Sequence, residues 1–108
     1  MGKFIMVAQS QAIDGRDDEL NAWYDGHHFA EICSLPGVTG GRRFEASMMP
    51  MGPAGQKYLA IYEIQCDHPG TVMAELGRRL QSGEMTPSPE ALDLPNATIW
   101  FYEQREGY

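Results

Sequence analysis

Three stretches of this chain have the length of a β-strand and carry apolar side chains at most positions. They are KFIMVAQ at residues 3–9, YLAIYEIQC at 58–66 and TIWFYE at 98–103. Successive residues of a strand point to opposite faces of a sheet, so each stretch presents apolar side chains on both faces. A sheet built from these strands therefore has to be covered on both sides.

The segments between these strands predict two helices. Acidic residues at 17–19 favour a helix start, and Pro36-Gly37 ends that helix, which gives a first helix over about residues 17–35. A second helix opens at residues 67–70, shows apolar residues at every fourth position and is closed by Gly83. Both helices therefore have one apolar face to pack on a sheet.

The remaining segments predict one more strand and two loops. Residues 38–47 alternate like a strand, whereas 48–56 and 86–97 are rich in proline and other loop formers. The order is β-α-β-β-α-β in a single domain, residues 1–108. This order predicts an α+β, ferredoxin-like sandwich, in which two helices cover one face of a four-stranded antiparallel sheet.

The second face of this sheet has no cover within a chain of 108 residues. A second copy of the sheet, packed face to face, would cover it, so we expect a homodimer. A domain of this size buries only about 60 to 70% of its unfolded surface, which also favours association. In the loop, Met48, Met49 and Met51 predict either a lid or a contact with the other subunit, or else an exposed hairpin tip.

Charge and composition exclude several classes of partner. The net charge of −7 repels phosphate backbones and anionic membrane surfaces, so we expect neither nucleic acid nor a membrane as a partner. No segment approaches the ~18 apolar residues of a membrane span, and we expect a cytoplasmic protein. Cys33 and Cys66 lack both a CxxC spacing and nearby metal ligands, which favours buried free thiols.

We expect no metal and no cofactor. His27 and His28 are adjacent, and adjacent side chains on a helix point ~100° apart, so they cannot share one ion. The glycines at 37, 40 and 41 match neither a dinucleotide fingerprint nor a phosphate loop.

Several short motifs together resemble a known family. They are Leu20-x-x-Trp23-Tyr24-Asp25-x-x-His28, Leu35-Pro36-Gly37-Val38, Arg42-Arg43-Phe44 and Tyr58-Leu59-Ala60-Ile61-Tyr62-Glu63. This set resembles the EthD-like branch of the dimeric α+β barrel superfamily over most of the chain. The resemblance implies a ferredoxin-like sandwich that pairs as a dimeric α+β barrel. The same scaffold carries polyketide cyclases, lactone isomerases, cofactor-independent oxygenases and haem-degrading enzymes, so it selects no single reaction.

The resemblance also points to one histidine. It maps the histidine of the family's first helix onto His28, although the proline that usually follows two residues later is replaced by Ala30. His27 stands where the family usually carries an acidic or other polar residue, and is the second candidate.

Helical spacing gathers a set of chemical groups around these histidines. Glu31 lies three residues after His28 and four after His27, and Tyr24 lies four before His28, so one imidazole can lie between a carboxylate and a phenol. With an ordinary pKa of ~6.5, a histidine oriented by a carboxylate can take and return a proton near neutral pH. The candidate catalytic residues are thus His28, Glu31, His27 and Tyr24, although a structural role for these histidines is an equal alternative.

The first helix cannot be both straight and evenly amphipathic. Trp23 and Ile32 are too far apart around a regular helix to lie at the centre of one apolar face. Either the apolar arc is wide or the helix shifts at Gly26.

Aromatic residues on the first helix and the strands are candidates for the walls of a ligand pocket. Trp23, Tyr58 and Tyr62 lead this group, with Trp100 and Phe101 on the last strand, although aromatic residues more often serve as core. Arg42 and Arg43 alternate faces, so only one of them can reach a pocket and hold an anionic or enolate oxygen. We take Arg42 as the candidate.

Two functions follow from these observations. In the first, the protein is a cofactor-independent acid/base enzyme, with His28 moving a proton on a small, apolar compound that bears a carbonyl or phenol group, aromatic or polyketide-like. Cyclisation, isomerisation, decarboxylation and cofactorless oxygenation belong to this set. In the second, a homodimer binds an apolar small molecule, such as an aromatic ligand, or a partner protein without catalysis.

Overall fold

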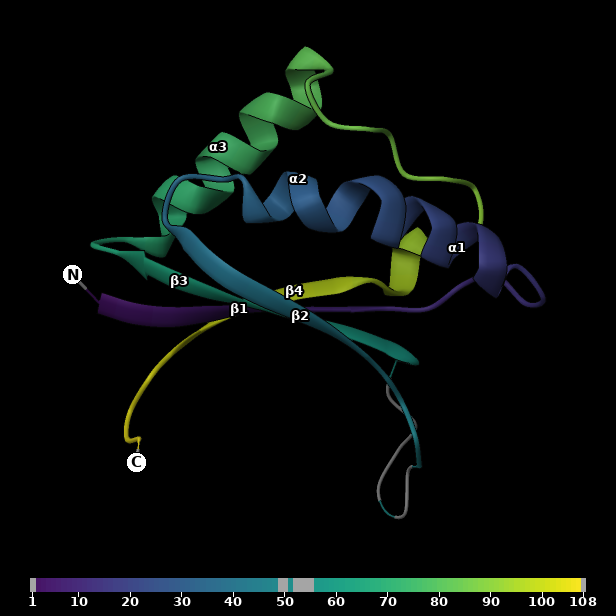
Figure 1. The fold of residues 1–108 in the computed structure, drawn as a ribbon, viewed down its shortest axis with the longest axis horizontal. Coiled ribbons are helices and arrows are strands. Elements are labelled where there is room, and N and C mark those ends of the chain that lie inside the picture. Colours follow the sequence, from purple (N-terminus) through teal and green to yellow (C-terminus); the bar gives the residue numbers. More distant parts are fainter. Residues whose placement is uncertain (1, 49–50, 52–55, 108) are drawn as a thin grey trace.

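The sheet predicted from the sequence is present in the computed structural model, which describes residues 2–48, 51 and 56–107. Its strands are β1 (Gly2–Ser10), β2 (Val38–Glu45), β3 (Tyr58–Cys66) and β4 (Thr98–Glu103). They lie in the order β2-β3-β1-β4, and every neighbouring pair is antiparallel. With two helical segments on one face, this is the ferredoxin-like arrangement, so the predicted fold class is confirmed (Figure 1).

The pairing register separates the two faces of the sheet. Met6 pairs with Tyr62 on one side and with Phe101 on the other, so all three side chains point to the helical face. Met6, Tyr62 and Ile64 are each at most 1% exposed and form the centre of the core, with Leu20 and Ile32 contributed by the first helix. Apolar residues on one face of each layer are therefore what hold the helices on the sheet.

The first helical segment shifts near Gly26, which is one of the two alternatives that its sequence pattern left open. It runs as α1 (Asp17–Trp23), a π-helical turn at Tyr24–His28 and α2 (Phe29–Cys33). The wider π turn rotates the later residues, so both Trp23 and Ile32 are buried. The shift expected at Gly26 is thus present as a π turn.

Gly41 on β2 allows this segment to approach the sheet closely. A Cβ atom at Gly41 would lie 2.9 Å from Tyr62 Cδ1, 3.1 Å from Cys33 Sγ and 3.2 Å from Phe29 Cζ. Each distance is below normal van der Waals contact, so a side chain at this position would push the helix away from the sheet.

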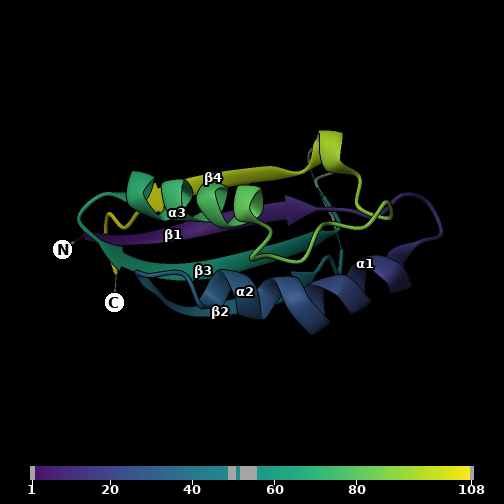
Figure 2. The ribbon, with the colours of Figure 1, turned by 90° about the horizontal axis from the view of Figure 1, so that it is seen from above.

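The second helix, α3 (Pro69–Ser82), covers the other half of the sheet. Proline occupies its first turn, and Gly83 ends it in the left-handed conformation with a φ of 80°. Figure 2 shows α1 and α2 along the β2 side and α3 along the β1 and β4 side. In Figure 1 the C-terminal end of α3 stands away from the sheet, and Figure 2 shows the chain then returning between α3 and the first helix.

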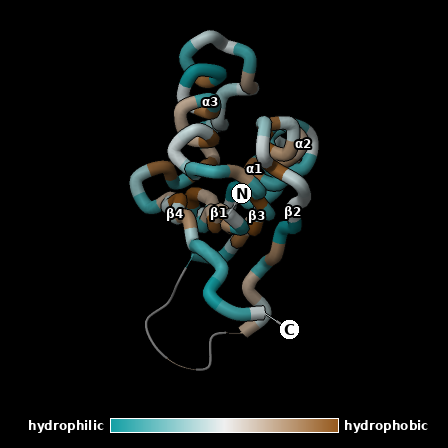
Figure 3. Tube along the Cα trace, turned by 90° about the vertical axis from the view of Figure 1, so that its left-hand side faces the viewer, coloured by the Kyte–Doolittle hydropathy of each residue, from teal (hydrophilic) through white to brown (hydrophobic). Residues whose placement is uncertain are grey.

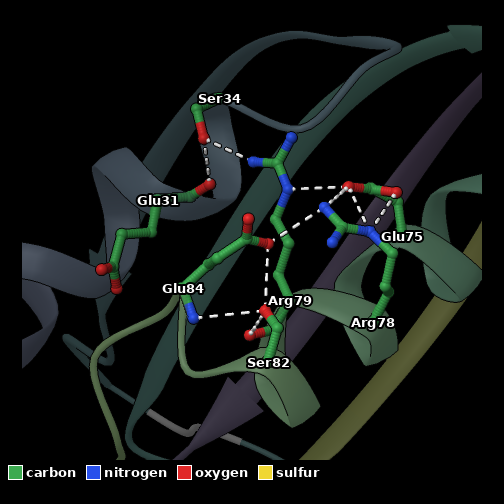
Figure 4. A network of polar contacts seen from close by, with 7 residues as sticks. All are labelled: Glu31, Ser34, Glu75, Arg78, Arg79, Ser82 and Glu84. Atoms are coloured by element: carbon green, nitrogen blue, oxygen red, sulfur yellow. Dashed lines mark hydrogen bonds and ion pairs between the residues drawn. The ribbon is translucent and has the colours of Figure 1, made fainter.

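A polar network joins the two helical segments near the end of α3 (Figure 4). Arg79 donates to Ser34 Oγ at 3.1 Å and to Glu75 at 2.9 Å, and Arg78 bonds Glu75 at 2.6 Å and Glu84 at 3.0 Å. Through Glu84, this network attaches the start of the segment after α3 to the helix, and through Ser34 it attaches α3 to the first helical segment.

That segment, residues 83–97, is referred to below as the roof segment. It contains the short 3₁₀ helix η2 (Leu94–Asn96), and it is tied to the chain after β1 by a bridge between Ala12 and Leu92. Gln11 donates to the Asp93 carboxylate at 2.9 Å. The loop predicted at 86–97 is therefore attached at its C-terminal end to the chain that leaves β1.

Both helical segments lie on one side of the sheet, and the centre of the opposite face is apolar (Figure 3 shows the two sides end-on). Ile5, Val7, Leu59 and Ile61 on the central strands point to this face, and Trp100 beside them is 62% exposed. The chain exposes 7308 Å². A compact monomer of 12.1 kDa exposes only about 6000 Å².

Among the described residues, no helix is long and apolar enough to cross a membrane. Of the three methionines singled out in the loop before β3, Met48 and Met51 are exposed, and Met49 lies outside the described residues.

Candidate functional site

A cavity of about 220 Å³ lies between the helical face of the sheet, the first helix, α3 and the roof segment. Most of its lining is apolar, and His28, Tyr24 and Tyr62 contribute polar groups to it. Trp23 forms part of the wall beside them. Four of the residues selected from the sequence therefore meet in one cavity.

The π turn directs His28 into this cavity and exposes His27. The His28 ring stacks on Trp23 with a centroid distance of 4.3 Å, and it meets the Tyr24 ring edge-on at 4.9 Å. Among the described residues, none is hydrogen-bonded to the His28 imidazole. Its ring nitrogens are therefore positioned by packing and are free to meet a ligand.

Burial sets the charge of His28. Removal from water disfavours the imidazolium and lowers the pKa of His28 to about 4, although the Glu31 carboxylate opposes the shift and the Arg43 guanidinium adds to it. His28 is thus neutral at pH 7, with one nitrogen able to accept a proton and the other able to donate a hydrogen bond.

Two buried phenols lie beside the histidine. The hydroxyl oxygens of Tyr24 and Tyr62 are 3.3 Å apart, at hydrogen-bonding distance. Burial raises the pKa of both residues, so both remain protonated. Because one hydroxyl donates to the other, the pair retains one O–H that can be donated to a ligand oxygen.

Arg43, and not Arg42, is the arginine that lies next to these phenols. The guanidinium of Arg43 sits 4.0 Å from the centre of the Tyr24 ring, and it donates to Asp25 at 2.6 Å and to Asn21 at 3.1 Å. Arg42 pairs with Ile61 on the opposite face of the sheet and is exposed. The choice of Arg42 as a pocket residue was wrong.

A β-bulge explains this error. Val38 pairs with Ile64 and points to the helical face, whereas Gly40 already pairs with Glu63 on the other face. The extra residue shifts the alternation by one position, so that the faces of Arg42 and Arg43 are exchanged relative to a regular strand.

Glu31 binds the roof segment and makes no hydrogen bond to His28. Its carboxylate accepts the backbone N–H of Thr86 at 3.0 and 3.2 Å and the Thr86 hydroxyl at 2.8 Å. Thr86 lines the cavity, and its carbonyl accepts a longer hydrogen bond from the Trp23 indole at 3.4 Å. The expected hydrogen bond from the His28 imidazole to the Glu31 carboxylate is absent, and Glu31 acts on His28 only through its charge. Figure 4 shows its side chain directed away from the arginine network.

The other aromatic candidates lie outside the cavity or at its margin. The Tyr58 hydroxyl donates to Asp17 at 2.6 Å and accepts from Asn21 at 3.2 Å, so this phenol ties the helix to β3. Trp100 lies on the opposite, uncovered face, whereas Phe101 packs against the core.

The roof segment contributes residues to the cavity that no sequence pattern indicated. Thr86, Ser88, Leu92 and Leu94 line the cavity, yet they lie in a loop without periodicity. The only available signal was the length of this proline-bearing segment, because long loops in small domains often belong to binding sites.

Within the described part of the chain, no group of three or more histidine, cysteine, aspartate or glutamate side chains could hold a metal ion. Cys33 and Cys66 are both free and partly buried, and burial raises the pKa of the Cys33 thiol. Among the described residues that line the cavity, the titratable side chains are one imidazole and two phenols, and Gln9, Ser10, Thr86, Ser88 and Thr98 add neutral polar groups.

No protein-family model and no curated protein matches this chain. Solved structures do match it over nearly its whole length. A protein described as a "putative monooxygenase" from Shewanella loihica PV-4 aligns with a TM-score of 0.66 at 10% identity, covering 98% of this chain and 97% of its own. An ethyl tert-butyl ether D (EthD) family protein from Bacillus halodurans C-125 aligns with a TM-score of 0.57 at 16% identity, covering 97% of this chain and 100% of its own.

A dimeric ferredoxin-like protein of unknown function from Jannaschia sp. CCS1 aligns with a TM-score of 0.61 at 8% identity, covering 95% of this chain and 100% of its own. At these identities the similarity is one of fold. The likeness to the EthD-like α+β barrels that the sequence motifs suggested is thus confirmed at the level of the fold.

Proposed function

We propose that this protein is a cofactor-independent acid/base enzyme that acts on a small, apolar compound bearing a carbonyl or phenol group. The observation that carries the proposal is the meeting of one neutral imidazole and a pair of protonated phenols in a mostly apolar cavity. Cyclisation, isomerisation and decarboxylation need no more than these groups, and cofactorless oxygenation would use dioxygen as a second substrate.

In the proposed reaction, His28 takes a proton from a carbon next to the ligand carbonyl, or from its phenol. The electron pair left behind moves to the ligand oxygen, which accepts a hydrogen bond from the Tyr24–Tyr62 pair. The resulting imidazolium and oxyanion attract each other strongly in an apolar cavity, which offsets the cost of charging a histidine whose pKa is about 4. The imidazolium then returns the proton to the product.

We also propose that the protein works as a homodimer joined through the uncovered face of the sheet. The centre of that face carries Ile5, Val7, Leu59 and Ile61, and Trp100 beside them is 62% exposed, which suits the apolar core of an obligate interface. The flat shape, 41 × 38 × 21 Å, and a radius of gyration of 14.4 Å against about 13 Å for a compact domain support the same conclusion. The Jannaschia protein of this fold is dimeric.

A second candidate function is binding without catalysis. The low pKa of His28 favours it, because a base of pKa about 4 removes protons only from an activated ligand. In that case the dimer would hold an aromatic ligand between Trp23, Tyr24 and Tyr62 and release it unchanged.

Deuterium incorporation separates the two functions without knowledge of the natural substrate. 2-Tetralone is a neutral bicyclic ketone with exchangeable C–H groups, and NMR in D₂O follows their exchange. We expect exchange to be faster with the protein than in buffer alone. His28→Ala should lower the protein-catalysed exchange rate by at least ~10²-fold at an unchanged melting temperature. His27→Ala is the matched control and should retain the rate. Binding of 2-tetralone without accelerated exchange would exclude the enzyme and favour the binding protein.

A further inference from the structure

We infer that the cavity selects electrically neutral ligands whose polar group meets His28 and the phenols and whose apolar part leaves through a mouth formed by Leu80, Leu94 and Ile99. This inference rests on the proposed function, because it concerns the ligand of the same cavity. It adds the charge and the shape of the ligand, and it removes decarboxylation, whose substrate is a carboxylate, from the proposed set of reactions.

The charge selection follows from what surrounds the ligand. Among the described residues that line the cavity, none is a lysine, arginine, aspartate or glutamate. The nearest guanidinium, that of Arg43, lies across the face of the Tyr24 ring and is engaged by Asp25 and Asn21. A permanent charge brought into this cavity would lose its hydration and find no opposite charge, and such a transfer is strongly unfavourable.

The polar groups inside the cavity suit a neutral oxygen. The Tyr24–Tyr62 pair offers one O–H, and a neutral His28 offers one donor and one acceptor. A carbonyl or hydroxyl oxygen uses these groups fully. A carboxylate could accept the same two hydrogen bonds, but both donors are neutral, so its negative charge would stay uncompensated.

The mouth accounts for three exposed apolar side chains. Leu80 on α3, Leu94 on η2 and Ile99 on β4 all line the cavity, yet they are 54%, 63% and 47% exposed. They come from three separate elements, and side chains that both line the cavity and reach solvent mark where it opens. Because the cavity itself holds about 220 Å³, below the usual range for sites that enclose a drug-sized ligand, part of a larger ligand would lie across these side chains.

Matched naphthalene ligands test both parts on the full chain by calorimetry at pH 7.5. 2-Acetonaphthone is neutral, 2-naphthoate is an anion and 2-(aminomethyl)naphthalene is a cation of similar size. We expect the ketone to bind at least about 30-fold more tightly than either ion. 2-Hexanoylnaphthalene, with four more methylene groups, should bind about 10-fold more tightly than the acetyl compound, and in the Leu94→Ser protein this ratio between the two ligands should fall most of the way to one.

Equal binding of the ketone and 2-naphthoate would overturn the charge selection, and loss of naphthoate binding in Arg43→Met would then identify a guanidinium turned into the cavity. If the hexanoyl compound still binds about 10-fold more tightly than the acetyl compound in both Leu94→Ser and Leu80→Ser, the proposed mouth is refuted. These results are separable from the proposed chemistry. Tetralone exchange with no charge preference refutes this inference alone, and charge preference with no exchange refutes the enzyme alone.

Discussion

Replacing Glu31 by alanine tests whether this carboxylate holds the roof segment in place. The substitution removes the acceptor for two donors of Thr86, its N–H and its hydroxyl. A hydrogen bond to a charged, partly buried acceptor contributes about 1.5 kcal/mol at the lower end of its range, so the two together contribute about 3 kcal/mol. Since 1.4 kcal/mol is a factor of ten, the open population of the roof segment should rise about 10²-fold.

Hydrogen–deuterium exchange measured by mass spectrometry reports this opening directly. Peptides covering residues 84–92 of the Glu31→Ala protein should exchange about 10²-fold faster, while those covering β1 and β3 should keep their rates. Thr86→Val, which keeps the N–H donor and loses the hydroxyl, should show about half of the effect in free energy. Glu19→Ala is the matched control, because Glu19 lies on the same helix and pairs only with exposed Arg16.

Two results would refute this reasoning. Unchanged exchange in residues 84–92 would mean that Met85 and Ala91, both buried, hold the roof segment by packing alone. Faster exchange confined to the first helix would mean that Glu31 supports the π turn and His28 instead.

Three further predictions concern the dimer, the pKa of His28, and Gly41, where the first helix approaches the sheet. Ile61→Lys on the uncovered face should convert a dimer into a monomer by light scattering, whereas Met73→Lys, an exposed position on α3, should not. The folded-state pKa of His28 lies below its unfolded value of 6.5, so the unfolded state binds more protons between pH 6.5 and about 4, and stability is lost as the pH falls through this window. In denaturant titrations from pH 7.5 to 4.5, His28→Phe should lose about 2 kcal/mol less than the parent protein. Gly41→Ala should lower the free energy of unfolding by about 1 to 3 kcal/mol in the same assay, because its Cβ would clash with Tyr62 and Cys33, and a change below 0.5 kcal/mol would show that the helix yields freely.

The order of helices and strands could be predicted because it depends on local patterns. Each of these patterns acts over a few neighbouring positions. They include strands with apolar side chains on both faces, a proline in the first turn of α3 and a left-handed Gly83 at its end. Even the π turn was foreshadowed, because Trp23 and Ile32 could not share the centre of one regular helical face. The members of the site on the first helix, His28 and Tyr24, came from the same local spacing.

The remaining parts of the site depend on contacts between distant segments. Glu31 binds Thr86, 55 positions later in the chain, and no local spacing distinguishes that partner from His28, three positions earlier. Arg43, and not Arg42, points to the helical face because of one bulged residue between Val38 and Gly40. The position of that bulge is set by pairing with β3. The sequence by itself therefore determined the elements and the helix face that carries the chemistry, because these follow from short-range periodicity. Only the tertiary structure decided which arginine lies beside the phenols and what closes the cavity, because those depend on strand register and on a loop that long-range contacts hold in place.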